Sequence, residues 1–476
     1  MIKNLQGIQR EYFSIIDDFL HNATDGLHKS VGTSYELIEQ LKSSPSQANG
    51  ADKAFEIAFT ALQNFYTEHE TILFSGARDI GGMKIVLGGS SRFTDSQFDS
   101  VRKMLMYVDT ILIPDPILPW VESAREEEQF KFVHFLKNAF TLWKLKPIVD
   151  APLHDMPILV FPSWEKRLEE NDKITQQRIT ALSVELLGRL LEESFVDIGD
   201  LFKYSDSRGA HLLGVLHKQG LLITPDGTMD QSPEDFLASY REYCKTYRAG
   251  VAATLPEKIP DGAVAILAFT ERIAPQFHLL ENSAELHSHP MPCTPASERY
   301  YSALSNTLSD RLEKQSYVKP ASVSILKALN SKKLSWLGNI PVEALVELRK
   351  NNENEKFRSK LGHYCQELSA AELDDIDRIA AHVGRGIDSL LNEHQKEIQS
   401  IQDRYQHLYL TTGIAAWITV AAAFVPALAP FAGKLFASSA IAATYLGEKL
   451  KERADTKAIA KSLLGMLAAA NQKRED

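Results

Sequence analysis

The segment that most constrains this chain is a long apolar stretch near its C-terminal end, residues 408–447, which begins at Leu408. It contains one formally charged side chain, Lys434, whereas 24% of the whole chain is charged. Pro426 and Pro430 divide the stretch into two arms, because proline removes a backbone donor and resists helix continuation. Each arm has about 17 residues, near the lower limit for a helix that crosses a bilayer. The pattern predicts an apolar helical hairpin that either enters a membrane or is buried in an assembly.

Some features of this hairpin favour a membrane. Basic residues follow it at Lys449, Lys451 and Arg453, so both ends would stay cytoplasmic under the positive-inside rule. Trp417 and Tyr445 add amphipathic rings of the kind found near membrane interfaces.

Other features favour burial within an oligomer. Both arms are short and rich in alanine, and Lys434 lies just after the turn, where its ammonium would have to reach the far interface. Both sets of features fit a hairpin that is stored against the protein and released into a membrane by a trigger.

Composition and charge limit the class of the remaining chain. A length of 476 residues indicates two to four domains, and 44% hydrophobic residues exclude global disorder. The net charge of -10 argues against a general polyanion binder. Three widely spaced cysteines give no disulfide framework and fit a reducing compartment. No signal sequence is evident at the N-terminus, so we expect a cytoplasmic protein, or one at the cytoplasmic face of the inner membrane.

Hydrophobic periodicity predicts a helix-rich, mixed α+β fold. Residues 1–70 have helical spacing, interrupted by a polar loop at residues 43–50. Further on, short apolar runs alternate with amphipathic stretches, which is the rhythm of a small α/β unit with a parallel sheet. The runs expected to form strands are residues 84–87, 110–114, 157–161 and 263–269.

The patterns also predict a linear order of segments. They are an N-terminal helical segment (1–70), an α/β unit (71–170), a winged-helix-like segment (171–240), a mixed α/β region (241–340), a helical stalk (341–407), the apolar hairpin (408–447) and an amphipathic tail helix (448–476). Within the stalk, a capping box at Ser369 and Glu372 is expected to start a long helix. Its near-heptad apolar spacing predicts a homo-oligomer.

Aspartates lie near the ends of the expected strands. Asp109 precedes the second run, Asp115 follows it, and Asp150 comes after a further apolar stretch. Ligands of parallel sheets bind beyond the carboxyl ends of the strands, so Asp115 and Asp150 are candidates for a nucleotide or Mg²⁺ site. The glycine-rich turn at residues 88–91 could bind an anion, but it lacks a Walker lysine. Turn and capping roles for these aspartates are the alternative.

Residues 172–235 predict three helices followed by a hairpin. The helices are expected near 175–191, 198–204 and 207–218, and the hairpin turns at Asp226 and Gly227. This order resembles a winged helix-turn-helix, whose third helix enters the major groove. The candidate nucleic-acid contacts on that helix are Arg208, His211, His217 and Lys218. Because basic residues are sparse, a protein-contact module is the alternative.

One short motif indicates metal chemistry. His287 and His289 occupy alternate positions before Pro290, as two zinc ligands on one strand would. The run through Ser297 resembles the signature of the JAMM/MPN zinc peptidases, which implies zinc ligands at His287 and His289. Tyr300 stands where that family has its aspartate ligand, and two protein ligands are too few for a catalytic zinc. We therefore expect no cofactor, with zinc as the alternative.

The order of parts resembles bacterial membrane effectors of antiphage or toxin systems, in which a cytosolic part holds a transmembrane hairpin in check. This resemblance of layout implies a non-enzymatic, membrane-perturbing homo-oligomer. A regulatory protein or a nucleic-acid ligand is a candidate partner, and the sequence does not identify the trigger. Two alternatives stay open. One is a cytosolic metal- or nucleotide-dependent hydrolase that uses His287 and His289, or Asp115 and Asp150. The other is a winged-helix nucleic-acid or protein adaptor.

Overall fold

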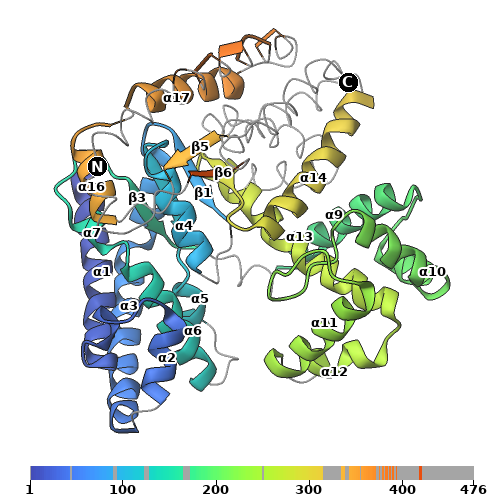
Figure 1. Cartoon of the computed structure of the whole chain (residues 1–476), viewed down its shortest axis with the longest axis horizontal. Coiled ribbons are helices and arrows are strands. Elements are labelled where there is room, and N and C mark those ends of the chain that lie inside the picture. The colour runs from blue at the N-terminus through green and yellow to red at the C-terminus, as the bar shows by residue number, and fades with distance from the viewer. Residues whose placement is uncertain are drawn as a thin grey trace. The chain divides into compact units, whose positions relative to one another are not determined.

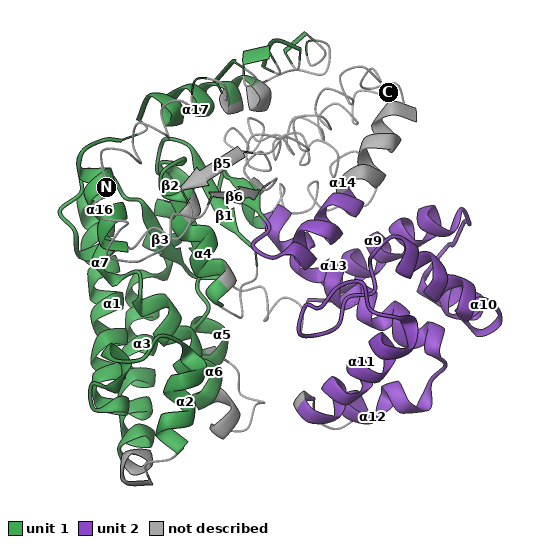
Figure 2. Cartoon of the chain, in the orientation of Figure 1, with its two compact units in different colours: residues 1–167, 282–291, 320–430 green, residues 168–281, 292–319, 431–476 purple. Residues whose placement is uncertain are grey.

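A computed structural model describes most of the chain, with gaps. The described residues are 2–42, 45–88, 94–122, 128–163, 172–248, 251–314, 334–337, 342–353, 355–370 and 417–420, with single positions between 375 and 393. Over these residues the protein is helix-rich and contains a small parallel sheet, which confirms the mixed α+β class (Figure 1). Two units are distinguished in Figure 2: unit 1 comprises residues 1–167, 282–291 and 320–430, and unit 2 comprises residues 168–281, 292–319 and 431–476.

Unit 1 is organised around a four-stranded parallel sheet with the order β3-β2-β1-β4. Strands β1 (Lys84–Leu87), β2 (Thr110–Pro114) and β3 (Ile158–Phe161) form where the apolar runs predict them, and every residue in them is buried. Burial on both faces explains why they are continuous apolar runs rather than alternating patterns. Strand β4 (His289–Met291) comes from beyond the first segment of unit 2 and pairs with β1.

Unit 1 also contains most of the described helices of the N-terminal half and two from further along the chain. They are α1 (Ile2–Thr24), α2 (Ser34–Lys42), α3 (Pro45–Asp79), α4 (Asp95–Met104), α5 (Leu118–Glu122), α6 (Glu128–Trp143), α7 (Lys146–Asp150), α16 (Val342–Lys350) and α17 (Glu355–Ala370), with a 3-10 turn η1 (Leu27–Lys29). Helices α1 and α3 run side by side (Figure 1). Gly76 of α3 permits this approach, because a β-carbon there would overlap the side chain of Leu5.

The outer edge of the sheet at β3 is closed by a glutamine side chain. Gln9 of α1 is 1% exposed and contacts one residue of β3 twice. Its Nε2 donates to the carbonyl oxygen of Val160 at 2.9 Å, and the backbone nitrogen of Val160 donates to its Oε1 at 2.9 Å. The side-chain amide thus takes the place of a further strand and satisfies groups that burial would otherwise leave unpaired.

Unit 2 is helical. It contains α9 (Lys173–Leu191), α10 (Ile198–Lys218), α11 (Pro233–Tyr247), α12 (Val251–Lys258), most of α13 (Asp261–Glu285) and α14 (Pro295–Lys314). Between α10 and α11 the chain makes a hairpin turn, in which the nitrogen of Thr224 donates to the carbonyl of Thr228 at 3.1 Å. Helix α14 holds this segment in place, because the Tyr300 hydroxyl donates to the carbonyl of Leu221 at 2.7 Å.

Two of the local predictions before residue 300 are wrong. The strand expected at residues 263–269 is part of helix α13. A short apolar run does not distinguish a buried strand from a buried helix, and its three alanines favour the helix. The loop expected at residues 43–50 is also wrong beyond Ser44, because α3 begins at Pro45, and proline is well suited to the first position of a helix.

The stalk and the apolar hairpin are described only in part. Ser369 lies inside α17 rather than at a helix start, which corrects the expected capping box. Residues Trp417–Val420 form strand β6, antiparallel to β5 (Leu334–Leu337), instead of part of a helical arm. Aromatic and β-branched residues favour that conformation.

The other positions predicted for the hairpin lie outside the described residues; they are Leu408, Pro426, Pro430, Lys434 and Tyr445. Among the helices that the structure describes, none is both long enough and apolar enough to cross a membrane.

Candidate functional site: a groove along helix α9

Helix α9 ends in a turn that folds the following loop back against it. Asp172 caps the start of the helix by accepting from the nitrogens of Ile174 and Thr175. At the other end, Glu192 adopts a left-handed conformation with φ 57°, and the nitrogen of Glu193 donates to the carbonyl of Gly188 at 2.9 Å. This is a Schellman-type ending in which glutamate occupies the position that glycine usually takes.

Gly188 allows the loop to approach the helix closely. A β-carbon at this position would lie 3.0 Å from the carbonyl oxygen of Glu193 and 3.4 Å from the ring of Phe195. The loop therefore runs near the helix surface until Asp197, which caps α10 by accepting from the nitrogen of Asp200 at 3.0 Å.

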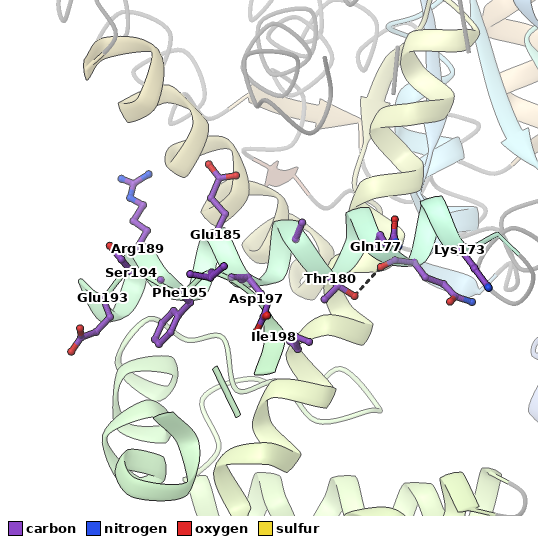
Figure 3. Close-up of a pocket in the computed structure, with 15 residues that line it drawn as sticks. Lys173, Gln177, Thr180, Glu185, Arg189, Glu193, Ser194, Phe195, Asp197 and Ile198 are labelled. Atoms are coloured by element: carbon purple, nitrogen blue, oxygen red, sulfur yellow. Dashed lines mark hydrogen bonds between the residues drawn. The ribbon is translucent and has the colours of Figure 1, made fainter. Parts of the chain in front are cut away.

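The helix and the loop enclose an open groove of about 820 Å³ that lies wholly within unit 2 (Figure 3). The helix contributes side chains at three- and four-residue spacing, such as Lys173, Gln177 and Thr180, which form one face. The opposite face of α9, including Ile179, Leu182 and Leu186, is buried in the core. The sequence of α9 thus leaves its more polar face open.

The groove has an apolar wall formed by the loop. Phe195 and Ile198 line it together with Val196, whose side chain is 90% exposed. The Phe195 ring packs edge-on against Tyr204 at 5.4 Å between centroids, which fixes its orientation.

Charged side chains surround this wall. Glu185, Arg189, Glu193 and Asp197 line the groove, and Lys173 lies at the opposite end from Arg189 and Glu193 (Figure 3). The described lining residues include no histidine or cysteine. The groove thus combines an apolar wall with side chains of both charges.

The predicted nucleic-acid contacts lie on the neighbouring helix. Helical geometry in α10 breaks at Arg208, which has φ -131° and ψ 29°, and so divides α10 near the junction predicted between two helices. Arg208, His211 and Lys218 are exposed, and their spacing places them toward one side of the second half. Arg208 forms an ion pair with Glu193 at 3.3 Å, and the His211 ring nitrogen Nδ1 contacts the Tyr204 hydroxyl at 2.9 Å.

The two histidines of the metal motif are not arranged as a zinc pair on one strand. His287 is exposed in a left-handed turn with φ 50°, and only His289 belongs to β4. Burial and the nearby Lys84 ammonium lower the pKa of His289 to about 4. A neighbouring cation opposes a bound metal ion, and the described residues contain no group of three potential ligands.

The remaining parts of the metal motif belong to unit 2. The Ser297 hydroxyl contacts the Thr294 hydroxyl at 3.0 Å near the start of α14, and Tyr300 is a core residue. These residues have structural roles in the first turns of a helix.

The predicted aspartates have structural partners and are not brought together. Asp115 is 2% exposed and accepts from the hydroxyls of Tyr12 at 2.7 Å and Tyr66 at 2.6 Å, and from the nitrogen of Ile117 at 2.8 Å. Burial raises the pKa of its carboxyl, and the tyrosine hydrogen bonds oppose this shift. Asp150 is exposed and forms an ion pair with Lys146 one helical turn away. Asp115 thus has no open side for a nucleotide or Mg²⁺.

The groove has no counterpart among the sites expected from the sequence. One signal was present, namely the adjacent apolar residues Phe195 and Val196 inside an otherwise acidic and polar loop. No family model, curated protein or solved structure matches this chain, so the site is interpreted from its own geometry.

Proposed function

We propose that the protein is a membrane-perturbing effector of the bacterial defence or toxin type, whose folded part controls the apolar segment 408–447. The observation that carries this proposal is the presence of a single charged residue, Lys434, in the whole segment. A stretch of this composition is stable only in a lipid environment or against a protein surface. Because its arms are short and rich in alanine, insertion into the membrane is conditional, and it involves several copies of the chain.

Control by the folded part is supported by the way α16 is held against the residues that precede β2. Arg349 is 5% exposed and donates to the carbonyls of Val108 at 3.0 Å and Asp109 at 2.8 Å. It also forms an ion pair with Asp155 at 2.8 Å. A buried guanidinium with this many partners is costly to remove, so it fixes α16, which precedes the apolar segment in the sequence, to the sheet region of unit 1.

Fractionation and vesicle leakage test the proposal. The full chain is compared with a deletion of residues 408–447 and with Phe424→Glu, which places a charge inside the first arm. We expect the intact chain to sediment with membranes and to release dye from anionic vesicles, and both variants to lose these properties. Val251→Glu is the matched control, because Val251 is 76% exposed in α12 and lies outside the segment.

Expression of residues 371–476 without the folded part gives a second readout. We expect loss of membrane potential in cells, detected with a voltage-sensitive dye. A full chain that remains soluble without detergent, together with no leakage from any variant, contradicts the proposal.

A second candidate function, a winged-helix recognition module in unit 2, is supported by the helix break at Arg208. The break, the left-handed Gly220 and the turn at Gly227 follow the order of helix, helix and hairpin. In this arrangement Arg208 and Lys218 would contact phosphates.

Binding of a 20-base-pair duplex at several salt concentrations tests this second candidate. Arg208→Glu and Lys218→Glu are each expected to weaken binding and to reduce the salt slope by about 1, as for one phosphate that is no longer neutralised. Lys203→Glu is the control, because Lys203 is 79% exposed on the first half of α10. Equal weakening by all three charge reversals, or no binding, contradicts DNA recognition and leaves the protein-contact alternative.

A further inference from the structure

Soon after helix α17 the chain folds back against it. The positions described between 378 and 393, which are 378, 379, 381–383, 385, 386, 389, 390 and 393, are all helical and are called the return helix below. Three contacts join it to α17: Lys360 with Glu393 at 2.9 Å, Tyr364 with Gly386, and Glu367 with His382 at 3.6 Å. The partners run in opposite order along the two elements, so α17 and the return helix form an antiparallel hairpin within unit 1.

The face of the return helix that meets α17 carries two buried apolar residues. Val383 lies three residues before Gly386 and Leu390 lies four residues after it, which places both on the same side of the helix as Gly386. Val383 is 0% exposed and Leu390 is 4% exposed. The absence of a side chain at Gly386 lets the Tyr364 ring approach, because a β-carbon there would overlap the ring. Helix α17 thus covers the apolar face of the return helix.

The same two residues belong to the near-heptad pattern that predicts a homo-oligomer. Val383 and Leu390 are seven positions apart, and Ile376, which lies outside the described residues, continues this spacing in the sequence. A coiled coil between copies needs such a stripe to face the partner. One helix face cannot pack against α17 and against a second copy at the same time. The contact within the chain and the contact between chains therefore exclude each other.

The polar contacts of the hairpin are weak enough to be reversible. The Lys360 and Glu393 side chains are both exposed, and exposed ion pairs contribute little to stability. The Glu367 carboxylate is shared between His382 and His363 of its own helix, and both imidazoles are exposed. A partner that binds only the open form can therefore shift the hairpin toward that form.

We propose that α17 is an autoinhibitory element whose competitor is a second copy of this chain. At low protein concentration α17 covers Val383 and Leu390, because an element of the same chain has a high effective concentration. When the hairpin opens, the return helices of two or more copies pair through these residues. A further consequence rests on the proposed membrane function: pairing would bring together the segments 408–447 of several copies.

Two substitutions that both open the hairpin test this proposal, because only one of them leaves the apolar stripe intact. Tyr364→Asp acts from α17, whereas Val383→Asp acts on the stripe itself. The full-chain variants are compared by size-exclusion chromatography with light scattering over a range of concentrations. We expect Tyr364→Asp to lower the Kd of self-association at least about tenfold, as for an open form that is rare in the unchanged chain. Adding Val383→Asp to Tyr364→Asp should abolish this gain.

Tyr35→Asp is the matched control, because Tyr35 is 69% exposed on α2, and it should leave the Kd unchanged. Circular dichroism and tryptophan fluorescence check that each variant is folded. A milder pair of changes gives a second test. Lys360→Glu should strengthen self-association a few-fold by placing two carboxylates together, and adding Glu393→Lys should reverse this effect.

Self-association that Tyr364→Asp does not strengthen, or strengthens no more than Tyr35→Asp does, overturns the proposal. A gain that persists after Val383→Asp is added also overturns it, because another surface would then be responsible. Vesicle leakage separates this proposal from the membrane function. Stronger self-association by Tyr364→Asp without leakage from any variant supports autoinhibition and contradicts the membrane role. Leakage by the unchanged chain, with no gain in association by Tyr364→Asp, supports the membrane role and contradicts autoinhibition.

Discussion

Gln9 and Asp115 show how single polar side chains hold unit 1 together. Both are buried, and both join helix α1 to a strand of the sheet: Gln9 through the backbone of Val160, and Asp115 through the hydroxyl of Tyr12. Each contact satisfies donors and acceptors that burial separates from water. The effect of replacing either residue is therefore dominated by the partner that is left unpaired.

Replacement of Gln9 by alanine is expected to lower the free energy of unfolding by about 2–4 kcal/mol. The change leaves both the nitrogen and the carbonyl oxygen of Val160 without their side-chain partner. Urea denaturation followed by tryptophan fluorescence measures the loss. Lys3→Ala, at an exposed position of the same helix, is the control. A loss below about 1 kcal/mol would show that water or another group replaces the amide.

His289 is expected to make the stability of unit 1 depend on pH. Burial and Lys84 hold its pKa at about 4 in the folded protein, below the ordinary value of 6.5. The unfolded chain therefore binds the proton first as pH falls. Protonation of His289 therefore leaves the free energy of unfolding unchanged above about pH 6.5. As the pH falls toward 4 it lowers this free energy, by at most about 3 kcal/mol.

Urea denaturation at pH 7 and pH 4 measures this contribution. In His289→Gln the difference in unfolding free energy between the two pH values should become smaller than in the unchanged protein. An identical pH dependence in both proteins would assign the loss to other groups.

At the scale of elements, the sequence predicted the helices and strands that have a clear hydrophobic pattern of their own. β1, β2 and β3 are runs of buried apolar residues, and α9 and α10 show clear helical periodicity. The strand predicted at residues 263–269 was wrong because an alanine-rich apolar run fits a buried helix as well as a buried strand. Strand β4 has only three residues and forms by pairing with β1, which is about 200 residues earlier in the chain. Its local sequence therefore did not predict a strand.

Prediction of the groove would have required the tertiary structure. The sequence predicted α9, but which face of the helix stays open is decided by the helices that cover the other face. The path of the loop beside it is set by Gly188 and by the left-handed Glu192. Neither residue carries a signal that distinguishes it from an ordinary helix position.

Replacement of Glu192 by glycine is expected to stabilise unit 2 by about 0.5–1 kcal/mol, because a left-handed conformation strains residues that carry a side chain. Thermal unfolding followed by circular dichroism measures the gain. Glu193→Gly is the matched control: its φ is not positive, so it should give no gain. Stabilisation by both changes would indicate an effect of charge rather than of backbone strain.

At the scale of the whole molecule, the positions of the tryptophans provide a probe for one unit. All five lie in the segments of unit 1, at positions 120, 143, 164, 336 and 417, so tryptophan fluorescence reports on unit 1, whereas circular dichroism reports on both units. If the two units unfold separately, the fluorescence and circular dichroism transitions are expected to have different midpoints.

Leucines buried in the two units give a matched pair of substitutions. Leu212→Ala in α10 should lower the stability of unit 2 by about 2–5 kcal/mol and shift the circular dichroism transition, while the fluorescence midpoint stays in place. Leu112→Ala in β2 should shift the fluorescence midpoint, since both leucines are 0% exposed. Equal shifts of both signals by Leu212→Ala would show that the two units unfold as one.

The late position of β4 has a consequence for synthesis on the ribosome. Strand β1 is synthesised long before β4, which covers one of its edges. About 130 residues lie between the end of β3 and the end of β4, and the ribosome needs roughly 6–26 s to translate them. During that interval the nascent chain presents an unpaired apolar strand edge, the kind of surface to which chaperones and other unfinished chains attach. The yield of native protein should therefore depend on how fast the intervening segment, residues 168–281, is translated and folds.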